Sequence, residues 1–185
     1  IRKSGNQTSF GIVDWDLTNK ETDFVKVHGY NSRYSIENFL YDPIYLSILL
    51  MNNNAHQIFK LYDLEETYNQ YNLPNESDEF LQKVADNFYK VLNEKFQFKD
   101  KMEKDFIKYY NGKSIQVPRE YLRKKGHDIE VILKESFPLF NTKYPNEGIF
   151  QMEITKIIAK CYPFIPLESF EVIKKIIGSH SKASC

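Results

Sequence analysis

The chain has 185 residues, of which 42% are hydrophobic and 27% are charged, so it suits one folded domain and is neither a disordered nor a fibrous protein. Twenty-five basic side chains balance 25 acidic ones, so any attraction to a polyanion must come from a local patch or an added cation, which argues against histone-like binding. The cysteines, Cys161 and Cys185, lie far apart without a CxxC pair, so neither a disulfide framework nor a structural zinc site is indicated, and a reducing, cytoplasmic environment is expected.

The first part of the chain has the sequence patterns of two strands followed by two helices. Residues 10–14 form a continuous apolar run bounded by polar residues, which is typical of a short strand covered on both faces. Residues 23–29, "DFVKVHG", alternate and predict a second strand. Ser35 then caps a brief helix, and Pro43 starts the next one, up to about residue 52. Its apolar stretch, residues 44–51, is far below the roughly 20 residues that a membrane helix needs, so no membrane partner is expected.

Helical patterns dominate the rest of the chain. Residues 75–96 carry apolar side chains at intervals of three and four, which predicts the longest amphipathic helix. Asn111-Gly112 predicts a β-hairpin near residues 106–117. Further helices are expected over residues 119–137, 148–161 and 166–177, with Gly178 just past the end of the last and a loose tail behind it. The expected architecture is therefore α/β, with a core segment at residues 1–60 and a mostly helical region at residues 61–185 packed on it.

Two aspartates follow the first strand, Asp14 and Asp16, with Trp15 between them. Because strand side chains alternate, both carboxylates should point the same way from the carboxyl end, where ligands bind in open α/β sheets. Two adjacent anions repel unless a cation lies between them, and carboxylate oxygens are preferred ligands of Mg²⁺ and Mn²⁺, which also coordinate phosphates. The pair therefore indicates phosphodiester hydrolysis. The alternative is that Asp14 begins an Asx turn and Asp16 a loop, both merely exposed to water.

The order of three motifs carries a family resemblance. "GIVDWD", the strand "FVKVHG" and then "RYSIENFLYDP" together resemble the Toprim domains of OLD-type nucleases and of their stand-alone relatives, such as the effectors of PARIS anti-phage systems. The resemblance covers about residues 9–50 and extends loosely through "VPREYLRKKGHDI". It implies a Toprim-like parallel-sheet core and a metal-dependent nuclease that cuts DNA or RNA, tRNA included. It also implies a toxic anti-phage effector, a homodimer, and control by an ABC-type ATPase on another chain, since no GxxxxGK[ST] motif occurs here.

The resemblance also assigns site residues. By position, Asp14 and Asp16 match the ligands of Mg²⁺ or Mn²⁺, and Glu37 matches the acidic residue that opens the following helix, so these three are the candidate catalytic residues. The Toprim fold starts with a strand that ends in glutamate, and nothing in "IRKSGNQT" can be that strand. The resemblance therefore implies a site glutamate upstream of Ile1, so that the catalytic site in this chain is expected to be incomplete.

Basic residues gather in "REYLRKKGH", which is either a phosphate-contacting patch or a solvated helix face. His127 follows Gly126 where the relatives commonly have a lysine, so that positive charge is either missing or supplied by a neighbouring lysine. The candidate nucleic-acid-binding residues are Arg33, Arg119, Arg123, Lys124, Lys125 and His127.

Several other residues have both an ordinary and a functional interpretation. Glu37 either serves the metal or only interacts favourably with the helix dipole. Trp15 either stacks on a base or packs beneath the sheet, and His28 is either a packed residue or a catalyst. Cys161 is expected to be a core residue. The alternative function is a non-catalytic interaction module that keeps the Toprim scaffold and docks to an ATPase partner.

Overall fold

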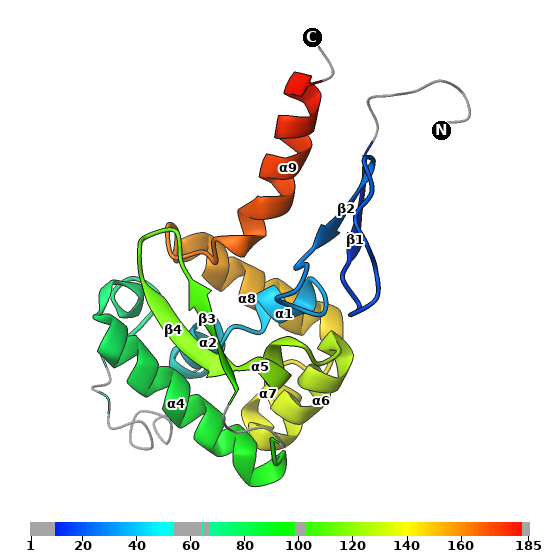
Figure 1. Ribbon diagram of the computed structural model, residues 1–185. Coiled ribbons are helices and arrows are strands. Elements are labelled where there is room, and N and C mark those ends of the chain that lie inside the picture. Colours follow the sequence, from blue (N-terminus) through cyan, green and yellow to red (C-terminus); the bar gives the residue numbers. More distant parts are fainter. Residues whose placement is uncertain (1–9, 54–63, 65–66, 99–102, 183–185) are drawn as a thin grey trace.

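The computed structural model describes residues 10–53, 64, 67–98 and 103–182 and has a mixed α/β architecture (Figure 1). Strands β1 (Gly11–Asp14) and β2 (Val25–His28) pair in parallel, and β3 (Lys104–Lys108) and β4 (Ser114–Pro118) form an antiparallel hairpin. Gly112 adopts a φ of 87° in the hairpin turn, as the Asn-Gly pair predicts. The α/β class is therefore confirmed. Within the described ranges each sheet has two strands, so the larger parallel-sheet core of a Toprim domain stays a prediction.

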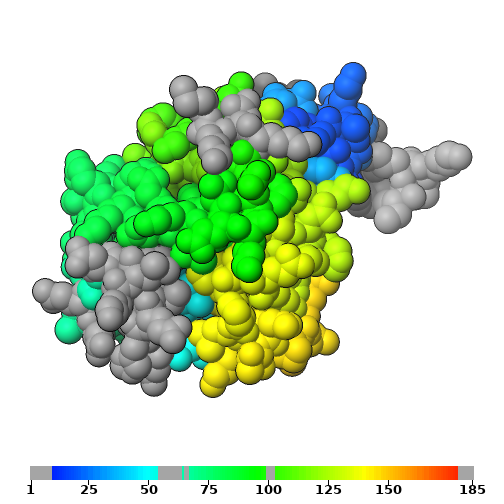
Figure 2. All heavy atoms as spheres, turned by 90° about the horizontal axis from the view of Figure 1, so that it is seen from below, coloured from blue at the N-terminus to red at the C-terminus, as the bar shows by residue number. Residues whose placement is uncertain are grey.

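Helix α2 (Pro43–Asn52) forms the centre of the molecule. The Asp42 side chain caps it by accepting the N–H of Ile44 at 2.9 Å, and the residues from Pro43 to Met51 are all buried. It packs against α4 (Asp78–Lys95) and α8 (Glu147–Lys160). Figure 2 shows α4 in green beside the yellow α6–α7 segment on one face, with the blue N-terminal segment at its edge. A helix that is apolar all round belongs in such a central position.

The remaining elements surround this core or lead away from it. They are α1 (Glu37–Leu40), the short 3₁₀ helix η2 (Leu73–Asn75), α5 (Arg119–Leu122), α6 (Gly126–Ser136), α7 (Pro138–Lys143) and α9 (Glu168–Lys182). None of the helices in the described ranges is both long and apolar enough to cross a membrane.

Two helix predictions are corrected. The single helix expected over residues 119–137 is two helices, because the Asn38 amide donates to the carbonyls of Leu122 and Lys124, at 3.0 Å each, and so draws them out of helical pairing. The last helix continues through Gly178 to Lys182, so the prediction that it ends before that glycine is wrong. A helix tolerates an interior glycine at a cost of only about 1 kcal/mol.

The first strand also differs from its prediction. It was expected to be buried on both faces, yet Ile12 is 53% exposed and Val13 is 39% exposed. Helix α9 packs on β2, where Val27 is 2% exposed, and no other described strand lies beside β1. Figure 1 shows the β1–β2 pair and α9 projecting together from the helical body. The apolar run therefore marks a strand correctly but not a covered one.

Candidate functional site

Asp14 is the last residue of β1, and Asp16 lies in the turn that follows. Asp16 and Leu17 have φ values of 48° and 60°, in the left-handed region that non-glycine residues seldom adopt. The N–H of Asp16 donates to the carbonyl of Tyr34 at 2.9 Å, which holds this turn against the segment before α1. The direction of Asp16 is therefore set by the turn and not by strand alternation, on which the sequence prediction depended.

The Asp14 carboxylate is partly buried beside two other acids. Its Oδ1 accepts the N–H of Ile36 at 3.0 Å, which ties the end of β1 to the start of α1. Burial raises the pKa of Asp14, and the charges of Glu37 and Asp16 raise it further, while the Ile36 hydrogen bond opposes them. The fold thus brings Asp14, Asp16 and Glu37 close enough for their charges to interact. A cation placed there would relieve the repulsion.

Glu37 opens α1 and lies against the first residue of α6. A Cβ added to Gly126 would come within 2.6 Å of the Glu37 Cβ and 3.0 Å of its Oε2, so only glycine fits. The N-terminal end of α6 therefore abuts the Glu37 carboxylate, and the positive end of the helix dipole favours that charge. The sequence indicated Gly126 only as part of a Gly-Lys-like motif. Its close approach to Glu37 appears in the fold alone.

Asn38 is the organising residue that the sequence analysis missed. It is 1% exposed, and its Oδ1 accepts the N–H of Ser35 at 3.0 Å and the Ser35 hydroxyl at 2.9 Å. Its Nδ2 donates to the carbonyls of the loop between α5 and α6. Asn38 thereby holds Glu37 and the loop of Lys124 and Lys125 in one arrangement. A lone asparagine in "SIEN" gives no sequence signal for such a role.

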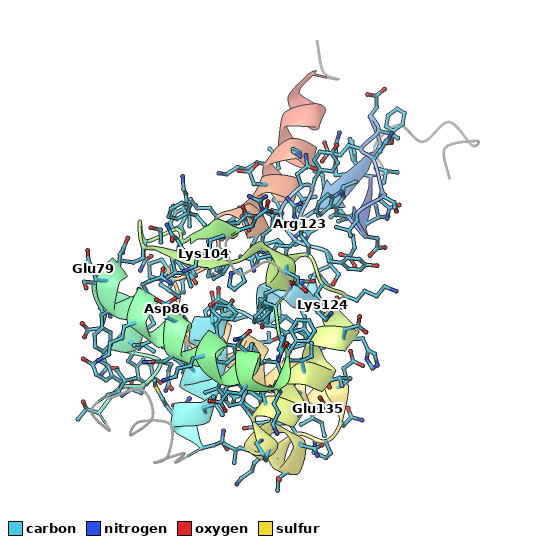
Figure 3. All side chains as sticks on the ribbon, turned by 60° about the horizontal axis from the view of Figure 1, so that its bottom comes forward. Glu79, Asp86, Lys104, Arg123, Lys124 and Glu135 are labelled. Carbon is cyan, nitrogen blue, oxygen red and sulfur yellow. The ribbon has the colours of Figure 1, made fainter. Side chains whose placement is uncertain are left out.

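The basic candidates occupy different environments. Arg119 pairs with Asp105 at 2.9 Å and Glu103 at 2.7 Å, so its charge is already matched. The Arg123 guanidinium lies 5.5 Å from the Trp15 ring centre, and the Lys124 ammonium 4.4 Å from the Phe96 ring centre. Figure 3 shows Arg123 and Lys124 between the β1–β2 pair and the helical body. Lys125 and His127 are exposed at the start of α6. Three basic side chains therefore follow one another beside the acids.

Arg33 does not belong to this surface. It is fully buried, and it donates to Glu168 at 2.8 Å and to the Asn38 carbonyl at 2.7 Å. The prediction that Arg33 contacts nucleic acid is wrong for this arrangement. Its guanidinium instead joins α9 to the segment that carries the candidate acids.

The other candidates have structural environments. Trp15 is 8% exposed, and its ring packs edge-on against Tyr30 with centroids 6.2 Å apart, so the packed interpretation fits better than base stacking. The His28 ring lies 4.4 Å from that of Phe39, and burial and the charge of Arg33 lower the pKa of His28. Burial raises the pKa of the Cys161 thiol to about 12, so the thiol stays protonated at neutral pH.

Carboxylates are the right type of ligand for a hard divalent cation, but too few of them are gathered in the described part of the chain to hold one alone. Carboxylate oxygens suit Mg²⁺ and Mn²⁺, and the pKa of Asp14 is raised by burial first and then by the charges of Glu37 and Asp16. No group of three or more metal-ligating side chains among the described residues is gathered closely enough to hold an ion. Asp14 and Asp16 could therefore supply only part of a coordination sphere, which substrate oxygens, water or other residues would complete.

Comparison with known proteins identifies no relative. The chain matches no family model, and comparison with curated proteins and with solved structures gave no match.

Proposed function

We propose that this chain carries the metal-binding acids of a Toprim-type nuclease, which hydrolyses phosphodiester bonds in DNA or RNA. One observation supports this more than any other: Asp14 and Glu37 come from separate segments, which the 3.0 Å hydrogen bond from the Ile36 N–H to Asp14 joins. Burial, and after it the charges of Glu37 and Asp16, raise the pKa of Asp14 there. Folding places repelling carboxylates together only at a cost, and such arrangements are concentrated at functional sites.

Each residue has a distinct proposed role. Asp14 and Asp16 would hold Mg²⁺ or Mn²⁺, which when bound supplies an activated water and stabilises the leaving oxygen. Glu37 lies against Gly126 and orients the acidic edge toward the start of α6. Lys124 and Lys125 precede that helix and would contact the phosphates of the strand being cut. The neutral net charge of the chain makes such a local patch necessary.

A nuclease assay tests the proposal. Single-stranded DNA, duplex DNA and structured RNA, tRNA included, are incubated with the protein in Mg²⁺ or Mn²⁺, with EDTA as the control. If residues precede Ile1 in the natural protein, the longer chain is used, because the resemblance places a further acid there. Asp14→Asn and Asp16→Asn should each abolish cleavage without lowering the melting temperature, because asparagine keeps an oxygen for the Ile36 N–H and tolerates the left-handed φ of residue 16. Glu94→Gln, an exposed acid on α4, is the matched control and should cut normally.

The basic residues are tested separately. Lys124→Glu combined with Lys125→Glu should weaken nucleic-acid binding and flatten its dependence on salt, since each phosphate contact releases counterions. Lys90→Glu combined with Lys95→Glu places the same charge change on α4. An equal loss in both pairs would show an effect of net charge and remove the patch from the proposal.

The second candidate is a non-catalytic module that docks to a partner such as an ABC-type ATPase. The exposure of Ile12 and Val13, with no described strand other than β2 beside β1, favours it. A protein that binds neither Mn²⁺ nor nucleic acid and cuts no substrate would support the module and exclude the nuclease.

A further inference from the structure

A hollow lies where three segments of the chain meet, and none of the candidate acids lines it. It has a volume of about 180 Å³ and is bordered by η2, by the turn of the β3–β4 hairpin and by the residues that follow α8. Figure 1 shows the hairpin turn on the side of the body away from β1. Its lining includes Gln70, Tyr71, Asn75, Asn111, Lys160 and Tyr162, and it is called the tyrosine pocket below.

Direct contacts fix the walls of the tyrosine pocket. The Asn111 amide donates to the carbonyl of Pro74 at 3.2 Å, which joins the hairpin turn to η2. The Cys161 thiol donates to the carbonyl of Gln70 at 3.6 Å, which joins the end of α8 to the same region. Behind the pocket, Phe164 is fully buried and stacks on Tyr109 with ring centroids 3.7 Å apart. The pocket is therefore formed before any ligand arrives.

Two aromatic rings stand exposed around this pocket. Tyr71 is 65% exposed and Tyr162 is 66% exposed, although both are large rings that proteins usually cover at least in part. They lie far apart in the sequence, and the fold places both at the lining of this pocket. An exposed aromatic face beside a preformed pocket is suited to stacking on a planar ring.

The polar groups of the pocket select the kind of ring. Gln70 Oε1 is buried without a hydrogen-bond partner among the described residues, and the Asn75 amide donates to the nearby Tyr71 carbonyl at 2.9 Å. Side-chain amides both donate and accept, as the edges of nucleobases require. Lys160 is the charged residue of the lining, which contains no described carboxylate, so the pocket favours an anion.

We infer that the tyrosine pocket binds a nucleotide, with its base against Tyr71 or Tyr162 and its phosphate at Lys160. The volume is below the roughly 300 Å³ at which pockets for drug-sized ligands begin, so a base can enter while the sugar and phosphate stay at the mouth. The nucleotide is either free or part of a single strand, because both present the same base and phosphate. The inference does not depend on the proposed nuclease activity, since none of the candidate acids lines this pocket.

Calorimetric titration tests the inference on the whole chain, with EDTA present to prevent cleavage. The probes are AMP, UMP, adenosine without phosphate, and a short single-stranded RNA. At least one of Tyr71→Ala and Tyr162→Ala should weaken nucleotide binding by roughly tenfold, the scale of one lost base stack, and the variant that does so identifies the stacking ring. Tyr162→Phe should retain binding. Lys160→Gln should weaken AMP but not adenosine, and preference for RNA over AMP would identify a strand as the ligand.

Control variants distinguish binding at the tyrosine pocket from binding elsewhere on the protein. Phe106→Ala removes an equally accessible ring elsewhere, 53% exposed on β3, and should leave binding unchanged. Lys90→Gln, at an exposed lysine on α4, should also leave it unchanged, whereas a loss equal to that of Lys160→Gln would show an effect of net charge and overturn the inference. It is likewise overturned if no nucleotide binds, if Tyr71→Ala and Tyr162→Ala bind like the parent chain, or if an uncharged disaccharide binds in place of nucleotides.

Discussion

The helical body and the β1–β2 pair are built in opposite ways. In the body, α2 is buried along almost its whole length, and the charged groups inside have partners. In the β1–β2 pair, apolar side chains face water while two aspartates stand close together at its end. Parallel strands are normally covered on both faces, and two strands alone are seldom stable. Among the described residues, the body is therefore closed around its core, whereas β1 keeps apolar side chains exposed.

Buried charged side chains in the body have partners from several elements. Asp42 is fully buried, caps α2 and accepts the Tyr109 hydroxyl at 2.8 Å. Burial raises the pKa of Asp42, and the charge of Arg33 acts against this increase. Arg33 in turn holds Glu168 at the start of α9. This network links α2, the hairpin and α9, so the body also anchors the helix that supports β2.

Removing Arg33 should give the largest loss of stability. Arg33→Met leaves Glu168 and the buried Asp42 without their cation, and breaking such a pair costs about 3 to 5 kcal/mol of unfolding free energy. Arg119→Met breaks pairs of similar length at the surface, where water screens the charges, and should cost much less than Arg33→Met. Urea unfolding of both variants measures the difference. Equal losses would mean that burial does not decide the strength of these pairs.

Substituting Gly126 should have the next largest effect, at the junction of the two regions. Gly126→Ala places a Cβ 2.6 Å from the Glu37 Cβ, and overpacking of this kind costs about 1 to 3 kcal/mol. Shortening the neighbour, in Glu37→Gly with Gly126→Ala, should restore part of the loss. Gly178→Ala is the control, because a Cβ there meets nothing within 4 Å. Thermal unfolding compares the four chains, and a harmless Gly126→Ala would show that α6 can move away from Glu37.

Local patterns predicted the elements of the body well. The apolar spacing before residue 96 and the Pro43 start gave α4 and α2, and the Asn111-Gly112 pair gave the hairpin, because these signals act within a few residues. The break between α5 and α6 could not be predicted, since it depends on the amide of Asn38, more than 80 residues earlier in the chain. The exposure of β1 could not be predicted either, because it depends on what lies beside the strand.

The acids of the candidate site could be predicted from the sequence, but the buried residues that hold them in place could not. Asp14, Asp16 and Glu37 were identified from sequence, and the fold brings them into electrostatic contact. Arg33 was assigned to the surface because its charge suggests it, yet Glu168, 135 residues away, pairs with it inside. Pairs so distant leave no local pattern, which is also why the placement of Tyr71 and Tyr162 at one pocket appears only in the structure.

The contribution of Asp14 to the unfolding free energy should be small and should decrease as pH rises, which is the reverse of the usual trend for an aspartate. Because burial and Glu37 raise its pKa, the folded state binds this proton more tightly than the unfolded state does, so Asp14 lowers stability as pH rises from about 4 toward neutrality. Asp14→Asn removes the effect, and its unfolding free energy should exceed that of the parent chain at pH 7 by less than about 0.5 kcal/mol, given screening by water. The gain should shrink toward pH 4.

Glu21, which pairs with Lys175 on α9, should show the opposite pH dependence of stability. Burial would raise its pKa, but the hydrogen bond and charge of Lys175 dominate and lower it, so Glu21 contributes stability that is lost as pH falls. Glu21→Gln should therefore show the opposite trend to Asp14→Asn in urea titrations between pH 4 and 7. Saturating Mg²⁺ should reduce the gain from Asp14→Asn if the acids bind the ion. Identical trends for the two variants would contradict the assigned environments.

The smallest effect is expected at the exposed face of β1. Val13 and Val27 are register partners in the parallel pair, yet Val13 is 39% exposed and Val27 is 2% exposed. Val13→Ala should therefore change the unfolding free energy by less than about 0.5 kcal/mol, whereas Val27→Ala removes buried methyl groups and should cost about 1 to 3 kcal/mol. Urea unfolding at low protein concentration measures both. If Val13→Ala costs as much as Val27→Ala only at high concentration, and sedimentation shows association there, a second copy covers β1. If the two costs are equal at every concentration, β1 is covered within one chain, and the contrast between the closed body and the open β1–β2 pair is wrong.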